Sequence, residues 1–354
     1  MRRQLRCVIA AGGTAGHVLP ALAVAEALNE LGVFVSFAGS PDRVEARLVP
    51  DAGFELDTFR ISGLPRQPSL AQLASLGRAV AAPGVCRAIL HRRRADLVYG
   101  AGGYVAGPMV LAAASMRVPA ALSEADAQLG LANRLALPFA RRVFLAYPLA
   151  GREGPRYRVV GRPIPERARA ISQRKAREIF ELPADGAVLL VAGALAGARS
   201  LNELVVEAFG AVGPAILHIC GERDYPLLRA RVRRADYRLV PTTERIGAAY
   251  SAADLALARA GSSVWELAAA GKPAILIPYP FATGDHQAKN AGYFVRAGGA
   301  IMIRELELDQ VPERVRSLLG DPARLARMGE AMAGVAKPDA AREIAEGLVA
   351  LAAS

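Results

Sequence analysis

Residues 12–17 read Gly-Gly-Thr-Ala-Gly-His and combine close backbone approach with a titratable side chain. They lie between an apolar run at 7–11 and an apolar-periodic stretch at 18–31, an order that predicts a strand, a glycine loop and a helix. Glycines let the backbone approach a ligand, and the N–H groups at the helix start favour an anion such as phosphate. Neither the Walker pattern nor G-x-G-x-x-G is present, so we predict a phosphate or sugar-diphosphate contact, with a purely structural glycine turn as the alternative.

Two further strand-to-helix junctions carry single candidate residues. Glu266 lies about one turn into the helix that follows a predicted strand at 255–258, where a carboxylate can accept both hydroxyls of a ribose. A solvated helix glutamate is the alternative. Residues 100–108, Gly-Ala-Gly-Gly-Tyr-Val-Ala-Gly-Pro, form a second glycine-rich junction, in which Tyr104 either lines the site or packs against the loop.

Polar side chains crowd residues 285–290, Asp-His-Gln-Ala-Lys-Asn, at the start of another predicted helix. Such groups can donate to or accept from sugar hydroxyls and phosphate. Asp285 also suits an N-cap, and Lys289 a solvated charge. We therefore favour Gln287 and Asn290 as the ligand contacts of this cluster.

Residues 60–94 carry an apolar stripe at helical spacing, bordered by cations. This pattern suits an interface with anionic lipid, and a helix packed inward with ordinary surface arginines is the alternative. The stripe consists of Leu70, Leu73, Leu76 and Val80, and the cations are Arg66, Arg78, Arg87 and the run His91, Arg92, Arg93 and Arg94.

Short apolar runs alternate with helical patterns almost throughout, which predicts an α/β fold with parallel sheets covered by helices on both faces. We interpret the chain as two Rossmann-like halves. Pro163 and Pro165 favour an extended linker after a strand, so we place the domain boundary there. The expected domains are 1–161 and 162–338, and we expect a closing helix at 339–354 to return to the first domain.

Composition limits the class of protein and of partner. At 354 residues, 53% hydrophobic and 22% charged, the chain can form two globular domains. Three separated cysteines and four histidines predict neither a disulfide framework nor a zinc cluster, and no apolar stretch reaches the roughly 18 residues of a membrane span. The formal charge of +11 predicts an anionic partner. Aromatic residues make up only 6% and no nucleic-acid motif is present, so we expect a membrane surface or a phosphorylated substrate and no nucleic acid.

Taken together, four motifs in order resemble the MurG family, membrane-associated N-acetylglucosaminyltransferases of peptidoglycan synthesis. They are GGTAGHVLPALAVAEAL, GAGGYVAGP, GLANRLALPFARRVFLAYP and YPFATGDHQAKNA. The resemblance runs nearly end to end. It implies a GT-B fold, in which two Rossmann-like domains face each other across a cleft.

The resemblance also implies an activity: inverting transfer of N-acetylglucosamine from UDP-GlcNAc to the C4 hydroxyl of the muramyl sugar in lipid I, giving lipid II. We expect no metal or other cofactor, because helix N-termini and loop N–H groups stabilise the leaving UDP. The implied location is the cytoplasmic face of the cell membrane, as a peripheral protein, with Leu70, Leu73, Leu76, Arg78 and Arg92 as membrane contacts.

The resemblance assigns roles to individual residues. His17 is implied as general base or diphosphate contact, because an imidazole titrates near neutrality. Glu266 is implied to hold the ribose, and His286, Gln287 and Asn290 to contact phosphate and sugar hydroxyls. The other implied substrate-binding residues are Gly13, Thr14, Ala15, Gly16, Tyr104, Asp126 and Leu195.

The chain departs from the family pattern around the expected site. Residues 123–126 read Ser-Glu-Ala-Asp where the family usually has His-Glu-x-Asn, and residues 162–165 read Arg-Pro-Ile-Pro in place of Asn-Pro-x-Arg. In the loop 193–198, Leu195 stands where the family has serine, and the 259–266 segment is one residue shorter. A second interpretation therefore stays open: a MurG-like paralogue with another donor or acceptor, or a non-catalytic binding or scaffold protein of envelope synthesis.

Overall fold

A computed structural model describes residues 3–61, 70–193 and 198–353, with the side chains of 70–80 outside the description. The chain forms two compact units. One, the N-terminal unit, comprises Met1–Pro165 and Pro338–Ser354, and the other, the C-terminal unit, comprises Glu166–Lys337. The linker after residue 161 thus belongs to the N-terminal unit, because Arg162 hydrogen-bonds there to the backbone of Gly16 and Ala125.

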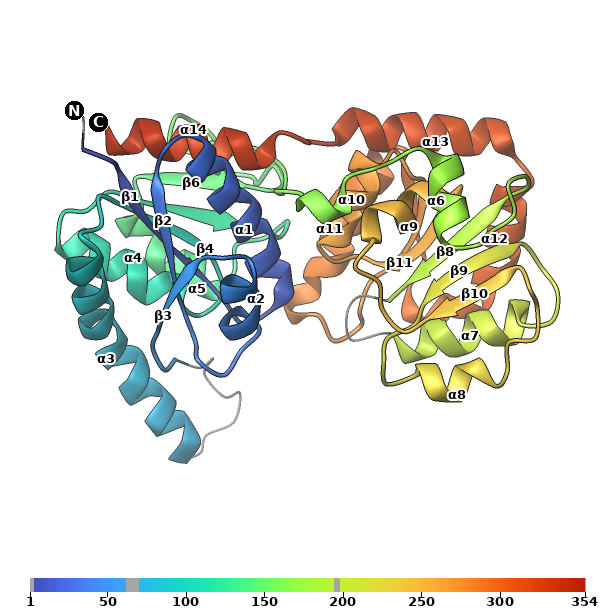
Figure 1. Cartoon of the computed structure of the whole chain (residues 1–354), viewed down its shortest axis with the longest axis horizontal. Helices are drawn as coiled ribbons and strands as arrows, with labels where there is room; N and C mark the ends of the chain where they lie inside the picture. Colours follow the sequence, from blue (N-terminus) through green and yellow to red (C-terminus); the bar gives the residue numbers. More distant parts are fainter. Residues whose placement is uncertain (1–2, 62–69, 194–197, 354) are drawn as a thin grey trace. The chain divides into compact units, whose positions relative to one another are not determined.

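A seven-stranded parallel sheet in the order β3-β2-β1-β4-β5-β6-β7 forms the centre of the N-terminal unit. Its chain order reverses between β1 and β4, as in a Rossmann-like fold. The strands are β1 (Arg6–Ala11), β2 (Phe34–Gly39), β3 (Glu55–Thr58), β4 (Leu97–Gly102), β5 (Ala120–Glu124), β6 (Arg142–Leu145) and β7 (Tyr157–Val159), and the helices are α1 (Ala15–Glu30), α2 (Glu45–Asp51), α3 (Leu70–Arg93), α4 (Ala106–Ser115), α5 (Leu131–Ala136) and α14 (Ala340–Ala352) (Figure 1).

The C-terminal unit has a six-stranded parallel sheet in the order β10-β9-β8-β11-β12-β13, with the reversal between β8 and β11. Both units are therefore Rossmann-like α/β domains, as predicted. The strands are β8 (Val188–Ala192), β9 (Ala215–Ile219), β10 (Tyr237–Val240), β11 (Leu255–Arg259), β12 (Ala274–Ile277) and β13 (Ala300–Met302), and the helices are α6 (Gln173–Ile179), α7 (Arg199–Phe209), α8 (Tyr225–Arg229), α9 (Ile246–Ala252), α10 (Ser263–Ala269), α11 (His286–Arg296), α12 (Val311–Leu319) and α13 (Pro322–Val335).

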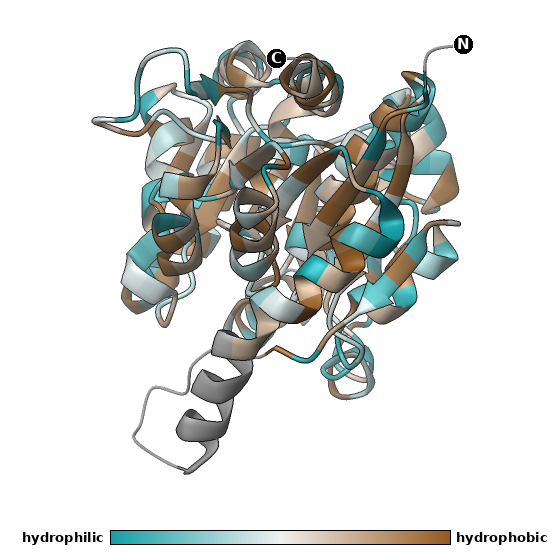
Figure 2. Ribbon diagram, turned by 90° about the vertical axis from the view of Figure 1, so that its left-hand side faces the viewer, coloured by the Kyte–Doolittle hydropathy of each residue, from teal (hydrophilic) through white to brown (hydrophobic). Residues whose placement is uncertain are grey.

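Apolar strands form the core of each sheet, and Figure 2 colours most strand segments brown while many helices carry teal stretches. Parallel strands covered on both faces read as continuous apolar runs in the sequence. Strand β8, for example, is buried over Val188, Leu189, Leu190 and Val191.

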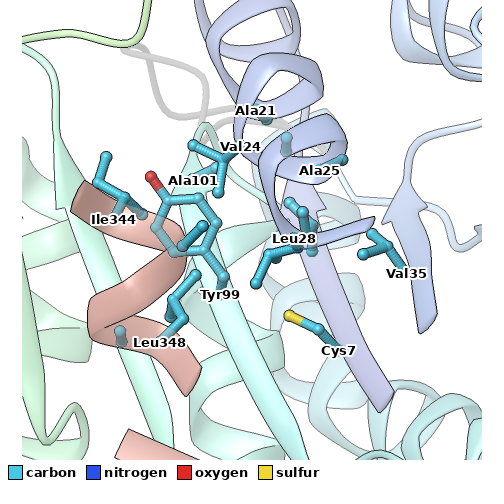
Figure 3. Packing of buried hydrophobic residues seen from close by; sticks show 14 of the residues in the cluster. Cys7, Ala21, Val24, Ala25, Leu28, Val35, Tyr99, Ala101, Ile344 and Leu348 are labelled. Atoms are coloured by element: carbon cyan, nitrogen blue, oxygen red, sulfur yellow. The ribbon is translucent and has the colours of Figure 1, made fainter. Parts of the chain in front are cut away.

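The closing helix α14 belongs to the N-terminal unit and packs into the same core as α1, β1 and β4 (Figure 3). Ile344 and Leu348 are fully buried there against Val24 and Tyr99. Full burial of an aliphatic side chain contributes about 1.5–3 kcal/mol, so these two residues hold the end of the chain on the N-terminal unit. The predicted return of the closing helix is confirmed.

Candidate active site

The glycine loops of the N-terminal unit follow β1 and β4, the two neighbouring strands between which the chain order reverses. Parallel strands end at the same edge of a sheet, and ligands of such folds bind at this reversal. Residues 12–14 follow β1, and residues 103–105 follow β4. The two glycine motifs of the sequence therefore lie side by side.

Contact between these loops explains why two of the positions are glycine. A Cβ atom on Gly103, whose φ is +79°, would lie 2.2 Å from the Gly12 carbonyl oxygen. One on Gly102, whose φ is +122°, would lie 2.6 Å from Cδ2 of His17. Both backbone conformations also disfavour side chains. The β4 loop thus packs directly against the β1 loop and against the His17 ring.

A buried glutamate on α2 anchors the first glycine loop. Glu45 has no exposed surface, and its carboxylate accepts hydrogen bonds from the Gly13 N–H (3.0 Å) and the Ser40 N–H (2.9 Å). A Cβ on Gly12 would lie only 2.4 Å from Oε1 of Glu45. Glu45 therefore holds the loop that precedes α1. The sequence analysis missed it, because a glutamate at a helix start looks like a solvated residue.

His17 lies in the first turn of α1, with Nδ1 3.3 Å from the Thr14 hydroxyl oxygen. Burial, with a smaller contribution from the positive charge of Arg162, lowers its pKa to about 4, although Asp126 and a hydrogen bond with the Gly12 backbone act in the opposite direction. The expectation of titration near neutrality is thus wrong for this conformation, because loss of water disfavours the imidazolium. At pH 7 His17 is a neutral imidazole, which can accept a proton.

Glu124 shapes the loop that brings Asp126 near His17. The Glu124 carboxylate is buried and accepts hydrogen bonds from the N–H groups of Asp126 (3.1 Å) and Gly130 (2.9 Å) and from the Asn133 amide (2.9 Å). Burial nevertheless raises its pKa. These bonds close the turn after β5, so that Asp126 exerts its charge on His17.

The remaining predicted residues of this unit surround the loop. Thr14 is exposed at the N-cap of α1, Ala15 is buried, and Gly13 and Gly16 are half-buried. Tyr104 is 56% exposed, so it does not pack down against the loop. The N-terminal unit thus brings together Gly13, Thr14, Ala15, Gly16, His17, Tyr104 and Asp126.

In the C-terminal unit, Glu266 lies on α10, after the end of β11. Its carboxylate accepts a 2.6 Å hydrogen bond from the hydroxyl of Tyr250, a buried residue of α9. Burial and the nearby carboxylate raise the pKa of Tyr250, so the phenol stays protonated as a donor. Glu266 is therefore held in place from the protein side, which does not fit a freely solvated glutamate.

The cluster at 285–290 follows β12, the neighbour of β11, and so lies at the same sheet edge as Glu266. His286 and Gln287 are half-buried; Nδ1 of His286 lies 3.0 Å from the Thr283 carbonyl oxygen, and Oε1 of Gln287 accepts from the Tyr279 N–H at 2.9 Å. Asn290 is only 2% exposed and presents almost no surface to a ligand in this conformation. The first turn of α11 is thus the accessible part of the cluster.

A buried polar network in the other half of the same sheet, around β9, is part of the core. His218 has no exposed surface, and its ring nitrogens contact the Tyr237 hydroxyl (2.8 Å) and the Asn202 amide oxygen (2.9 Å). Asn202 also donates to the Asp224 carboxylate at 2.9 Å. Burial lowers the pKa of His218 to about 3, so it is a neutral core residue that ties β9 to α7 and β10.

Part of the predicted membrane contact lies outside the described residues, namely the side chains of Leu70, Leu73, Leu76 and Arg78. The predicted substrate-binding residue Leu195 lies outside them as well. Arg92 is described: its guanidinium pairs with Asp57 at 2.7 Å and its side chain is 61% exposed. Within the described ranges, no helix is long and apolar enough to cross a membrane, and no cluster of three His, Cys, Asp or Glu side chains could hold a metal ion.

An exposed apolar surface that the sequence analysis missed lies on α5 and the turn after it. Leu131 and Leu135, one helical turn apart, are 66% and 67% exposed, and Phe139 is 44% exposed. Arg134 lies on the same short helix. We call Leu131, Leu135 and Phe139 the α5 patch.

Comparison with known proteins agrees with this architecture. Residues 7–145 match the glycosyltransferase family 28 N-terminal domain, and residues 188–344 match the glycosyltransferase family 28 C-terminal domain. The chain belongs to glycosyltransferase family 28. The first match ends with β6 of the N-terminal sheet, the second spans the whole C-terminal sheet, and the GT-B class expected from the sequence is confirmed.

Family 28 relatives match nearly end to end. The chain is 42% identical over 350 residues to the UDP-N-acetylglucosamine--N-acetylmuramyl-(pentapeptide) pyrophosphoryl-undecaprenol N-acetylglucosamine transferase of Halorhodospira halophila, covering 95% of this chain and 96% of that protein. The enzyme of the same name from Mycolicibacterium paratuberculosis is 42% identical over 359 residues, covering 96% and 87%.

Two solved structures show the same fold. The Acinetobacter baumannii MurG crystal structure has a TM-score of 0.79 at 28% identity, covering 98% of this chain and all of that one. The calicheamicin glycosyltransferase CalG4 has a TM-score of 0.73 at 19% identity, which shows the fold alone. The resemblance to MurG stated from the sequence motifs is confirmed, and the protein is a glycosyltransferase.

Proposed function

We propose that this glycosyltransferase transfers N-acetylglucosamine from UDP-GlcNAc to the C4 hydroxyl of the muramyl sugar of lipid I, with inversion, to give lipid II. The observation that carries the proposal is the 42% identity over nearly the whole chain to transferases whose name states this donor and acceptor. The retained glycine loops and Glu266 support it.

In the proposed reaction, the C4 hydroxyl oxygen attacks the anomeric carbon of the donor sugar, its proton passes to His17, and UDP leaves. A neutral imidazole in the first turn of α1 suits this step, because it can take up a proton without first losing one. Stabilisation of the leaving diphosphate would come from loop and helix N–H groups and from the His286–Gln287 turn of α11.

Glu266 is proposed to hold the ribose of the donor, with its orientation fixed by Tyr250. A carboxylate with one oxygen already bound to a phenol keeps acceptor capacity for sugar hydroxyls. No metal or other cofactor is part of the proposal.

We further propose that the enzyme works at the cytoplasmic face of the membrane as a peripheral protein. The α5 patch with Arg134, together with the formal charge of +11, supports contact with anionic lipid. Flotation with vesicles that contain phosphatidylglycerol tests it: Leu131→Asp/Leu135→Asp should reduce binding by about tenfold, since two exposed leucines that would enter the lipid are replaced by charges that anionic lipid repels. Unchanged flotation would remove the patch from the membrane contact.

UDP release in the presence of UDP-GlcNAc and a short-chain lipid I analogue tests the transfer. We expect turnover only with both substrates, and a fall of at least about 100-fold in His17→Ala, the typical size of a general-base contribution. His91→Ala, at an exposed histidine of α3, is the matched control. Binding of UDP-GlcNAc without turnover would favour the alternative of a paralogue with another acceptor or no catalysis.

A further inference from the structure

Arg259, the last residue of β11, is a buried cation with only 8% of its surface exposed. Its guanidinium donates to the Glu305 carboxylate (2.5 Å) and to the Ser200 hydroxyl oxygen (3.1 Å), and Ser200 in turn donates to Glu305 (2.5 Å). The guanidinium also donates to the carbonyl oxygens of Ile277 and Pro278, at 3.4 and 3.3 Å, where β12 ends. We call Ser200, Arg259 and Glu305 the Arg259 cluster.

The Arg259 cluster connects the carboxyl ends of four neighbouring strands, in the order β8-β11-β12-β13. Ser200 lies in the first turn of α7, after β8, and Glu305 begins the short helix η4 (Glu305–Gln310), after β13. The chain order reverses between β8 and β11, and ligands of such folds bind at the strand ends beside this reversal. The cluster therefore lies at the edge of the C-terminal sheet where a ligand is expected.

The charges of the Arg259 cluster compensate each other. Burial acts to raise the pKa of Glu305, but hydrogen bonds from Arg259 and Ser200, together with the charge of Arg259, outweigh it and lower that pKa. Glu305 is thus ionised at neutral pH. Replacing a buried ion pair by apolar residues often leaves stability unchanged, so stability alone does not account for the cluster. A planar guanidinium with contacts on several sides does fix the backbone that it binds.

The turn after β12 connects the Arg259 cluster to Gln287. Cζ of Arg259 lies 5.8 Å from the ring centroid of Tyr279, and the Tyr279 N–H donates to Oε1 of Gln287 at 2.9 Å. A backbone N–H can only donate, so the amide oxygen must face it, and the NH₂ group of Gln287 remains as the donor for a ligand. Tyr279 directly follows Pro278, whose carbonyl Arg259 binds. The orientation of Gln287 therefore depends on the backbone that Arg259 holds.

A second ion pair joins the same two segments. Arg304, next to Glu305, donates to both carboxylate oxygens of Asp285, at 3.2 and 2.9 Å. Asp285 directly precedes His286 and has a φ of +53°, a conformation that most side chains disfavour. Both side chains are about half exposed, so this pair is weaker than the buried one. Two adjacent residues after β13 thus contact the start and the end of the turn between β12 and α11.

We propose that Glu305 is a positioning residue for the sugar-nucleotide donor: through Arg259 it fixes the turn after β12, and thereby the NH₂ group of Gln287. The inference deepens the proposed function and rests on it, because the donor is the ligand that Gln287 is proposed to contact. The group that Gln287 recognises is a hydrogen-bond acceptor, either a sugar hydroxyl oxygen or a diphosphate oxygen of the donor.

The test measures the NH₂ resonances of Gln287 in the free full chain, assigned with Gln287→Ala, and the binding of UDP-GlcNAc by calorimetry. Glu305→Gln keeps the size of the side chain and loses its charge, so we expect it to shift or broaden these resonances and to weaken binding about tenfold. In the Gln287→Ala background the same substitution should weaken binding by less than about twofold, because both residues act through one contact.

A second variant and a control complete the set. Ser200→Ala keeps the ion pair, so it tests the cluster with less risk to folding and should weaken binding about threefold. Glu178→Gln, in an exposed ion pair of α6, is the matched control and should bind within about twofold of the wild type. Fluorescence of the buried Trp265 verifies that each variant is folded at the temperature of the titration.

The proposal is overturned if Glu305→Gln leaves the Gln287 resonances or the binding of UDP-GlcNAc unchanged, or if it weakens binding equally with and without the Gln287 side chain. Titration with UDP identifies the group that is contacted: a loss seen also with UDP assigns it to the diphosphate, and a loss seen only with UDP-GlcNAc assigns it to the sugar. If the wild type transfers no sugar, the proposed function fails, while the Gln287 resonances of the free protein still decide the role of Glu305.

Discussion

Glu45 offers the sharpest test of how the first glycine loop is held. In Glu45→Gln one carboxylate oxygen becomes an NH₂ group, so either the Gly13 N–H or the Ser40 N–H loses its acceptor and faces a donor. A buried unsatisfied N–H costs about 1–3 kcal/mol, and the remaining bond loses its charge assistance, about 1 kcal/mol more. The side chain has no exposed surface, so water cannot compensate.

We therefore expect Glu45→Gln to lower the free energy of unfolding of the N-terminal unit by about 3 kcal/mol. For a unit of this size, 1 kcal/mol corresponds to about 2–4 °C in Tm, so its melting transition should fall by about 6–12 °C. Glu30→Gln, at an exposed glutamate of α1, should change the stability by less than about 0.5 kcal/mol and is the matched control.

The single tryptophan, Trp265, is buried in the C-terminal unit and allows the two units to be followed separately. Calorimetry records both units, while tryptophan fluorescence follows the C-terminal one. Glu45→Gln should shift the calorimetric transition and leave the fluorescence transition in place. A variant that melts within about 1 °C of the wild type, or a shift seen only by Trp265, would refute the anchoring role of Glu45.

The other predictions concern the residues around the two candidate ligand sites. His17 has a pKa of about 4 in the folded protein and 6.5 in the unfolded chain, so the unfolded chain takes up the proton first as the pH falls. The free energy of unfolding should therefore decrease between about pH 6.5 and 4, by up to about 3 kcal/mol. Urea titrations should show a smaller loss in His17→Gln than in the wild type, with the remainder due to buried His218, whose pKa of about 3 acts in the same direction; an equally steep loss in both proteins would contradict it. Gly102→Ala should reduce UDP release by about tenfold or more, because its Cβ would lie 2.6 Å from the His17 ring and its φ is +122°. Gly84→Ala is the control and should keep full activity, because no atom lies within 4 Å of its Cβ. Tyr250→Phe should raise the KM for UDP-GlcNAc about fivefold at nearly unchanged kcat, since about 1 kcal/mol of orientation of Glu266 is lost; a fall in kcat alone would count against a donor-binding role.

The order of elements follows from the sequence because parallel strands leave a strong signal. Runs such as residues 7–11 and 187–192 are continuously apolar, and each is followed by a helical pattern. The closing helix could also be predicted, since residues 340–353 keep one apolar face. The place where this helix packs, in the core formed with β1 and β4, depends on tertiary contacts. The sequence therefore predicts it only through the expected class of fold.

The glycine loops were recognisable for a similar local reason, but their supports were not. Gly102 and Gly103 must be glycine because of the Gly12 carbonyl and the His17 ring, which are nearly 90 residues away in sequence. Glu45 acts through two N–H groups on other elements. Nothing in its own sequence surroundings distinguishes it from a solvated glutamate, so only the fold reveals its role.

Titration behaviour was the least predictable property of the site. The residue type places a histidine near neutrality, and loop position alone gave no reason to depart from that value. Burial beneath the second glycine loop and the charge of Arg162 lower the pKa of His17. Both causes are long-range in sequence, so the expectation failed for a physical reason and not through a misread motif.

Asp126 and Arg162 stand where the MurG family usually has asparagine, and in the sequence each reads as the loss of an amide. In the structure they act on the same imidazole with opposite sign: Asp126 raises the pKa of His17 and Arg162 lowers it. Two opposite charges at these positions keep the net charge around His17 the same as two neutral amides would. The two departures therefore offset each other electrostatically, which fits a site adjusted for catalysis better than one released from it.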